Sequence, residues 1–143
     1  MIKEMTSTDQ LRRMVDELEI RNLINDVARV TDAGDINEYG PLWAADAVAI
    51  FPRGSRSGRD EIVDAVKESR TKGLSGLGSA TRHLLTNLRV MSIDGDVAEA
   101  VSCVVFLGDT TGTPAIRSST RYLDTLVRES TKWQISQRRV VIE

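Results

Sequence analysis

The second half of the chain is a succession of four strand-length segments joined by short turns, and this pattern most constrains the fold. The predicted strands cover Thr81–Ile93, Val97–Leu107, Ala115–Arg128 and Lys132–Ile142. Asp94-Gly95, between the first two, is a strong hairpin signal. Strands joined by such short connections run antiparallel. The pattern therefore predicts an antiparallel meander and disfavours a doubly wound parallel sheet.

The first helix is predicted by one long series of apolar residues at helical spacing. Ser7, followed three residues later by Gln10, is typical of a helix start. Gly34 predicts the stop, because glycine adopts the left-handed conformation that often ends a helix. The apolar positions between them are Leu11, Met14, Val15, Leu18, Leu23, Ile24, Val27 and Val30. This spacing indicates a helix with one buried face.

Two further helices and one strand complete the first half. Asp35 opens a short helix over Ile36–Trp43, Ala47–Phe51 is a strand, and Arg59–Thr71 is a third helix. The predicted fold class is α+β: a cone-shaped, curved, mostly antiparallel sheet wrapped around the three helices of the N-terminal half, as a single domain over residues 1–143. The glycines of Gly73–Gly78 do not have dinucleotide-binding spacing, and we expect a flexible loop that could act as a lid.

Composition excludes several function classes. The net charge is −2 and no basic block occurs, so a nucleic-acid partner is not expected. One cysteine, Cys103, and one histidine are too few for a disulfide or a multi-thiolate zinc site, which leaves only a carboxylate-only metal site open. We expect no metal and no cofactor. The sequence has no signal core and no membrane-spanning segment, so we expect a cytoplasmic protein without a membrane partner.

The single histidine, His83, is the strongest candidate for chemistry. It lies in a predicted strand, and imidazole is the side chain best suited to moving protons near neutral pH. Asp32 lies at the end of the long first helix, where a carboxylate opposes the helix dipole and therefore calls for a partner. The two residues form a candidate proton-transfer dyad.

Several short motifs occur in the order found in one known family. They are Val30–Asp35, Leu42–Ala47, Gly58–Ile62, Arg82–Asn87, Asp94–Asp96 and Trp133–Arg138. From about Leu18 to Val141, the chain resembles the SnoaL-like branch of the nuclear transport factor 2-like, or cystatin-like, superfamily. It is similar to scytalone dehydratase and to hexachlorocyclohexane dehydrochlorinase.

The resemblance implies roles for three residues. His83 would be the general base, Asp32 would orient it, and Arg138 would help the leaving group depart. The chain departs from both relatives: Val27 stands where the dehydrochlorinase has a polar residue, and no second histidine is present to polarise a substrate as in scytalone dehydratase. Neither specific activity should therefore be transferred.

The predicted function is that of a cofactor-independent lyase or isomerase of the dehydratase, dehydrohalogenase or cyclase type. Its substrate would be a small hydrophobic molecule, aromatic, polyketide or steroid-like. The predicted substrate-binding residues are Val27, Tyr39, Trp43, Phe51, Leu85, Asn87, Val101, Cys103 and Tyr122. Strand alternation predicts that His83, Leu85 and Asn87 share one face, and that Arg138 shares a face with Gln134 and Ser136.

Alternatives remain open at this point. The same fold could serve as a non-catalytic binding or oligomerisation domain. Epoxide opening by water would need paired acids, and isomerisation of the ketosteroid type would use an acid as base. Arg138 or its neighbour Arg139 could instead form a surface ion pair. Apolar residues on both faces of Val97–Leu107 and Tyr122–Val127 predict a homodimer or homotrimer formed through the sheet face.

Overall fold

The computed structural model describes residues 4–142. The first part of the chain contains α1 (Ser7–Ala33), η1 (Ile36–Glu38), η2 (Gly40–Leu42), β1 (Trp43–Phe51), β2 (Gly54–Ser57) and α2 (Arg59–Thr71). The second part contains β3 (Arg82–Asp94), β4 (Val97–Gly108), β5 (Ala115–Glu129) and β6 (Lys132–Ile142). The four strands of the second half agree with the sequence pattern to within a residue or two.

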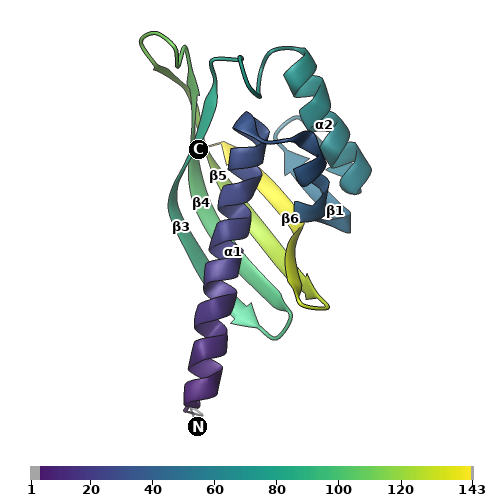
Figure 1. Cartoon of the computed structure of the whole chain (residues 1–143), viewed down its shortest axis with the longest axis vertical. Coiled ribbons are helices and arrows are strands. Elements are labelled where there is room, and N and C mark those ends of the chain that lie inside the picture. The colour runs from purple at the N-terminus through teal and green to yellow at the C-terminus, as the bar shows by residue number, and fades with distance from the viewer. Residues whose placement is uncertain (1–3, 143) are drawn as a thin grey trace.

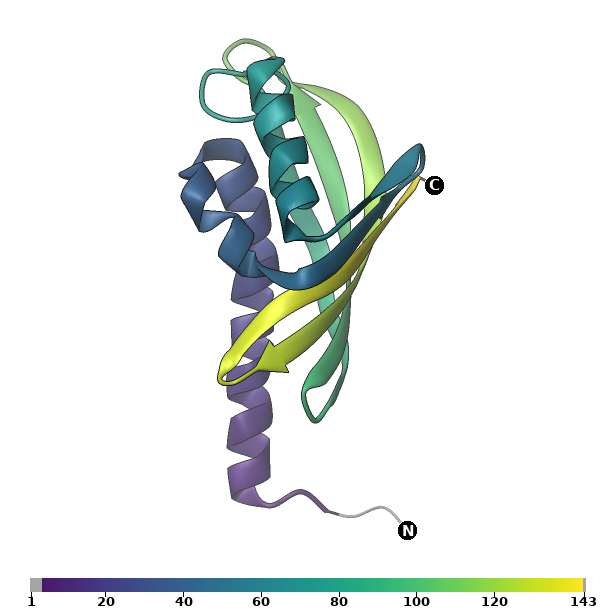
Figure 2. The same ribbon diagram turned by 90° about the vertical axis from the view of Figure 1, so that its right-hand side faces the viewer.

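The strands form one six-stranded sheet in the order β2-β1-β6-β5-β4-β3. Neighbouring strands are antiparallel except β1 and β6, which are parallel. The sheet curves, and α1 and α2 both lie on its concave side (Figures 1 and 2). The predicted α+β fold class, a curved and mostly antiparallel sheet around helices, is confirmed.

Some predicted element ends were wrong. The N-cap of α1 is Thr6 and not Ser7: its hydroxyl accepts from the backbone N of Asp9 at 3.1 Å, and the Asp9 carboxylate accepts from the backbone N of Thr6 at 3.3 Å. Gly34 has φ −87° and is extended, not left-handed. The predicted second helix is a pair of 3-10 turns, because Gly40-Pro41 interrupts it.

The first strand is also longer than its sequence indicated. It begins at Trp43 rather than Ala47 and pairs with β6 from that residue onward. The polar segment after it, Gly54–Ser57, turns back and pairs with β1 as an edge strand, although all four of its residues are exposed. An exposed edge strand lacks the apolar alternation by which strands are predicted.

The apolar series of α1 divides into two faces, and the prediction of one face was wrong. Ile20, Leu23, Ile24, Val27 and Val30 are buried against the sheet, whereas Leu11, Met14, Val15 and Leu18 are 54–66% exposed. The five-residue step from Leu18 to Leu23 breaks the phase of a helix that turns about 100° per residue. The two sets therefore lie on nearly opposite sides of the helix.

Near the β3–β4 and β5–β6 turns, α1 is held to the sheet by an ion pair around Asp16, a buried residue. Its Oδ1 accepts from Nη1 of Arg128 at 2.6 Å and from Nε1 of Trp133 at 3.1 Å. Arg128 also donates from Nε to Asp96 at 3.0 Å and lies 4.8 Å from the centre of the Trp133 ring. These contacts hold α1 to β5, β6 and the β3–β4 turn.

Two β-bulges change which residues face the interior. Thr125 pairs with Gln137 but Leu126 pairs with Ile135, so Ser136 is an extra residue in β6. The alternation shifts there, and Arg138 lies on the inner face with Ile135. The predicted grouping of Arg138 with Gln134 and Ser136 was therefore wrong.

A similar irregularity in β3 removes Asn87 from the inner face. Thr86 pairs with Cys103 and Arg89 with Val101, three steps on one strand against two on the other. Asn87, within this bulge, has φ +52° and is exposed. Asparagine tolerates this left-handed conformation better than most residues. The prediction that Asn87 faces the pocket with His83 was therefore wrong.

Candidate active site

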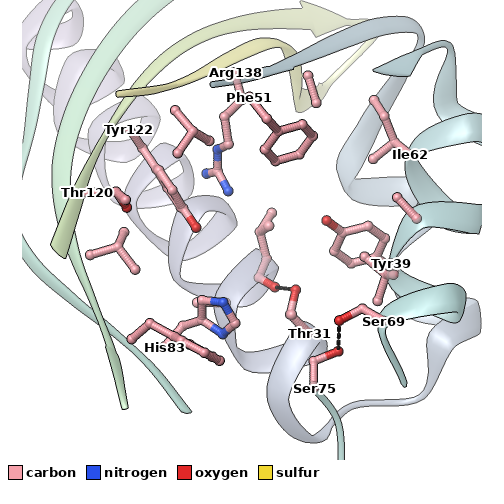
Figure 3. A pocket seen from close by; sticks show the side chains of 18 of the residues that line it. Thr31, Tyr39, Phe51, Ile62, Ser69, Ser75, His83, Thr120, Tyr122 and Arg138 are labelled. Carbon is pink, nitrogen blue, oxygen red and sulfur yellow. Dashed lines mark hydrogen bonds between the residues drawn. The ribbon is translucent and has the colours of Figure 1, made fainter. Parts of the chain in front are cut away.

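A cavity of about 390 Å³ lies between the concave face of the sheet, the last turns of α1, and α2. This volume is within the range of small-molecule sites. Its walls are mostly apolar and include Val27, Trp43, Phe51, Ile62, Val104 and Phe106. The polar side chains that reach it include His83, Tyr39, Tyr122 and Arg138 (Figure 3).

His83 and Asp32 are held together by two hydrogen bonds. The Nδ1 of His83 lies 2.7 Å from Oδ1 of Asp32, and the backbone N of His83 donates to Oδ2 at 2.7 Å. The contact expected between these two residues is present. With the Nδ1 proton donated to the carboxylate, Nε2 is left as an acceptor on the cavity side. Within residues 4–142, Nε2 has no hydrogen-bond partner.

The end of α1 that carries Asp32 is fixed by Arg70 of α2. Nη2 of Arg70 donates to the carbonyl of Gly34 at 2.8 Å, to that of Thr31 at 3.4 Å and to that of Val30. A cation at the C-terminal end of a helix also interacts favourably with the helix dipole. Arg70 thus caps the carbonyl groups at the end of α1, in place of the left-handed glycine that the sequence predicted. Its positive charge also offsets the negative charge of Asp32 at the same helix end.

Arg138 enters the cavity as a buried ion pair with Asp124 of β5. Nε donates to Oδ1 at 2.7 Å and Nη2 to Oδ2 at 2.9 Å. The guanidinium lies 4.1 Å from the centre of the Tyr122 ring and 5.6 Å from that of Trp43. Burial by itself would lower the pKa of Arg138, but the charge and hydrogen bonds of Asp124 raise it above the ordinary arginine value. Arg138 is therefore a permanent cation, and the surface ion pair considered for it is excluded.

Three neutral polar groups complete the site. Burial raises the pKa of Tyr122 and of Tyr39, with Arg138 acting in the opposite direction on each. Both phenols therefore stay protonated at neutral pH and can donate a hydrogen bond. The Tyr122 ring lies beside the Arg138 side chain, and its hydroxyl points into the cavity in the direction of His83 (Figure 3). The buried Nε1 of Trp43, a cavity residue, has no partner within the described part of the chain.

Five of the nine predicted substrate-binding residues line the cavity: Val27, Tyr39, Trp43, Phe51 and Tyr122. The other four do not, and those predictions were wrong. Asn87 lies in the β3 bulge. Val101 and Cys103 alternate with the inward-facing Ser102 and Val104, so they lie on the outer face of β4. Leu85 faces inward but packs against the core instead of the cavity.

Sequence reasoning missed Asp124, the most buried carboxylate of the site. The sequence contained a signal for it: Tyr122, Asp124 and Leu126 are spaced two residues apart in β5 and therefore share its inner face. A charge on the apolar face of a strand requires a partner of opposite charge. The partner could not be identified by counting, because the Ser136 bulge reverses the face of Arg138.

The described chain has two further properties that bear on function. No helix within residues 4–142 is both long enough and apolar enough to cross a membrane. Over the same residues, no three histidine, cysteine, aspartate or glutamate side chains lie together in a way that could hold a metal ion.

Comparison with known proteins identifies the family. Residues 12–139 match the SnoaL-like domain. No curated protein matches. A structure described as a nuclear transport factor 2-like protein with a cystatin-like fold, from Novosphingobium aromaticivorans, has 22% identity and a TM-score of 0.83, with 99% of this chain and 92% of that chain covered.

Two other similar structures carry the names of enzymes. LinA, a hexachlorocyclohexane dehydrochlorinase, has 19% identity and a TM-score of 0.78, covering 94% of this chain and 90% of its own. A candidate scytalone dehydratase from Novosphingobium aromaticivorans has 20% identity and a TM-score of 0.76, with 92% of this chain and 86% of that chain covered. At these identities the similarity establishes the shared fold. With the family match over nearly its whole length, the chain belongs to the SnoaL-like domain family.

Proposed function

We propose that this protein is a cofactor-independent lyase or isomerase in which His83 removes a proton from a carbon atom of a small hydrophobic substrate. The observation that carries this proposal is the Asp32–His83 pair at the wall of an apolar cavity, with Nε2 of His83 free to accept a proton. Arg138 and Tyr122 reach the same cavity from other strands.

The first step follows from the hydrogen bonds of His83. Asp32 holds the proton on Nδ1, so the lone pair on Nε2 faces the substrate. When Nε2 takes the proton from carbon, the imidazolium that forms is stabilised by the Asp32 carboxylate 2.7 Å away. A positioned general base of this kind contributes about 10²–10⁴-fold to a rate.

The second step needs a group that accepts developing negative charge. As the C–H bond breaks and its electrons form a double bond, the charge moves to a carbonyl oxygen or to a departing hydroxide or halide. Arg138 uses Nε and Nη2 for Asp124, and Nη1 makes no hydrogen bond within the described residues. Nη1 of Arg138 and the neutral Tyr122 hydroxyl are the donors proposed for this charge.

The cavity favours a ring system with few polar groups. Its apolar walls suit an aromatic, polyketide or steroid-like molecule with one carbonyl, hydroxyl or halide. The named relatives, a dehydrochlorinase and a candidate dehydratase, fit this class, because both names denote an elimination. Epoxide opening by water fits less well, since both acids near the cavity are engaged, Asp32 with His83 and Asp124 with Arg138.

The test begins with a panel of cyclic ketones, alcohols and halides, screened by thermal shift and then for product or for deuterium incorporation from D₂O. We expect a cyclic substrate to be converted by the wild type and not measurably by His83→Gln. Ser69→Ala, which changes another polar residue of the cavity wall, is the matched control and should retain turnover. Conversion that survives His83→Gln would show that the base is elsewhere.

A second candidate is non-catalytic binding of the same kind of molecule. The observation that favours it is the ion pair between Arg138 and Asp124. The carboxylate balances the charge of the guanidinium, so the cavity has no net positive charge to stabilise a developing anion. A ligand that stabilises the wild type and His83→Gln equally, without turnover by either, would support binding alone.

A further inference from the structure

The N-terminal half of α1 carries a second apolar face that no part of residues 4–142 covers. We call it the N-terminal stripe: Leu11, Met14, Val15 and Leu18, which are 63%, 66%, 54% and 60% exposed. These residues recur at the i, i+3, i+4, i+7 spacing of a helix-packing surface. The same helix buries its opposite face against the sheet, so the stripe is a separate surface from the core.

This part of the helix extends past the end of the sheet. In both views the first turns of α1 project beyond the β3–β4 and β5–β6 turns (Figures 1 and 2). Asp16 is the first buried residue of α1. The capping box of Thr6 and Asp9 nevertheless starts the helix at Ser7. A short helical segment without packing is only marginally stable in water, so a projecting apolar helix is expected to have a partner.

We propose that the partner is a second copy of this chain, and that the N-terminal stripes of the two copies pair antiparallel about a two-fold axis. The stripe is self-complementary in that orientation. Its pattern is symmetric about the point between Met14 and Val15, so Leu11 of one copy faces Leu18 of the other, and Met14 faces Val15. Such an isologous contact uses one patch twice and closes on itself.

The exposed residues beyond Leu18 favour the antiparallel orientation. The same face of α1 continues with Asn22, Asn25 and Arg29, all exposed. A parallel pair would bring these polar residues into the contact and place the two Arg29 side chains against each other. The antiparallel pair overlaps from Ser7 to Asn22, about 24 Å, and leaves Asn25 and Arg29 in solvent.

The flanking charges also complement one another. Arg12 and Glu19 are exposed and seven residues apart, so they lie on the same flank of the stripe. In the antiparallel pair, residues on one flank meet the same flank of the other copy. Arg12 of each copy therefore comes near Glu19 of the other, and the opposite charges meet twice across the axis.

The first test is sedimentation of the full chain. Two short helices make an interface below standard size, so we expect association over about 1–100 µM. Leu11→Glu/Leu18→Glu should halve the number of subunits in the particle. Asn25→Glu adds a charge to the same face of α1 outside the overlap and should leave the assembly unchanged. If copies also pair over the outer face of the sheet, the stripe variant still halves the particle.

The second test is disulfide trapping in a Cys103→Ala background. The two Met14→Cys positions would be about 1.5 Å apart along the axis, whereas the two Leu11→Cys positions would be about 10 Å apart. Only the first pair lies within disulfide reach. Met14→Cys should therefore form a covalent dimer under mild oxidation, and Leu11→Cys should not. Circular dichroism on each variant checks that the helix content is kept.

Several outcomes would overturn the proposal. They are a wild-type monomer at the highest concentration, an odd number of subunits, a particle that Leu11→Glu/Leu18→Glu does not change, and equal trapping of the two cysteine variants. Each outcome concerns assembly alone, so it is independent of whether His83 supports turnover.

Discussion

Two carboxylates lie behind the cavity wall, each hydrogen-bonded to a nitrogen-containing side chain that lines it, and the two pairs differ in what they can do. Asp32 and His83 have side chains 13% and 22% exposed, whereas Asp124 and Arg138 are 1% and 7% exposed. Histidine can gain and lose a proton near neutral pH, but arginine cannot. The first pair is suited to proton transfer, and the second to holding a guanidinium donor that stays protonated although its charge is balanced by Asp124. Similar geometry therefore supports two different roles, set by the base and its burial.

The sharpest way to test the first pair is Asp32→Asn. An amide at this position can donate to Nδ1, which favours the tautomer with the proton on Nε2, and that nitrogen then cannot accept a proton. We expect turnover to fall about 10²–10⁴-fold, with little change in the substrate concentration needed for half-maximal rate. Steady-state kinetics on the substrate found in the screen measures both. Unchanged turnover would mean that Asp32 serves only to hold β3.

The second pair should matter first for stability. Asp124→Ala leaves the Arg138 cation buried without a partner, and we expect a loss of about 3–5 kcal/mol in the free energy of unfolding. Asp124→Leu/Arg138→Met removes both charges and should restore most of that loss. Urea unfolding of the single and double variants gives the comparison. A double variant as unstable as the single one would show that packing, and not the unpaired charge, sets the cost.

Arg70, which fixes the helix end that carries Asp32, can be tested separately from the Asp32–His83 pair. Arg70→Ala removes the bonds to the last carbonyls of α1, and we expect about 1–3 kcal/mol of destabilisation from the lost charge-assisted hydrogen bonds. Turnover should fall as well, because Asp32 lies in the released turn. Lys72→Ala, which breaks the surface pair with Glu68, is the control and should leave the free energy of unfolding nearly unchanged, because both side chains are exposed. Equal effects of the two variants would contradict a capping role.

The smallest effect concerns the two tyrosines beside Arg138. Burial raises the pKa of Tyr39 and Tyr122, so the folded chain keeps protons that the unfolded chain loses above about pH 10. Their contribution to stability is complete below that pH and declines as the pH rises through it. Tyr39→Phe/Tyr122→Phe should therefore lose less stability than the wild type between about pH 9 and about pH 11. An equal loss of stability in the double variant and the wild type would show that folding does not raise the pKa of either phenol.

Local patterns in the sequence determined the elements and part of the site. The four strands of the second half follow from strand-length segments and turn signals, and α2 from its acidic start and apolar spacing. The dyad followed from a lone histidine and an acid at a helix end, where the dipole requires a partner. Such inferences succeed because each depends on a few neighbouring residues.

Tertiary structure decided which side of each element faces the cavity. A single extra residue at Ser136 reverses the alternation of β6 and brings Arg138 to Asp124, and the bulge at Asn87 moves that residue to the surface. The same holds for α1, where the reach of the sheet decides which apolar residues form the core and which remain exposed. The register of a strand and the burial of a helix face both depend on contacts between segments far apart in the chain. Spacing within one segment therefore cannot determine them.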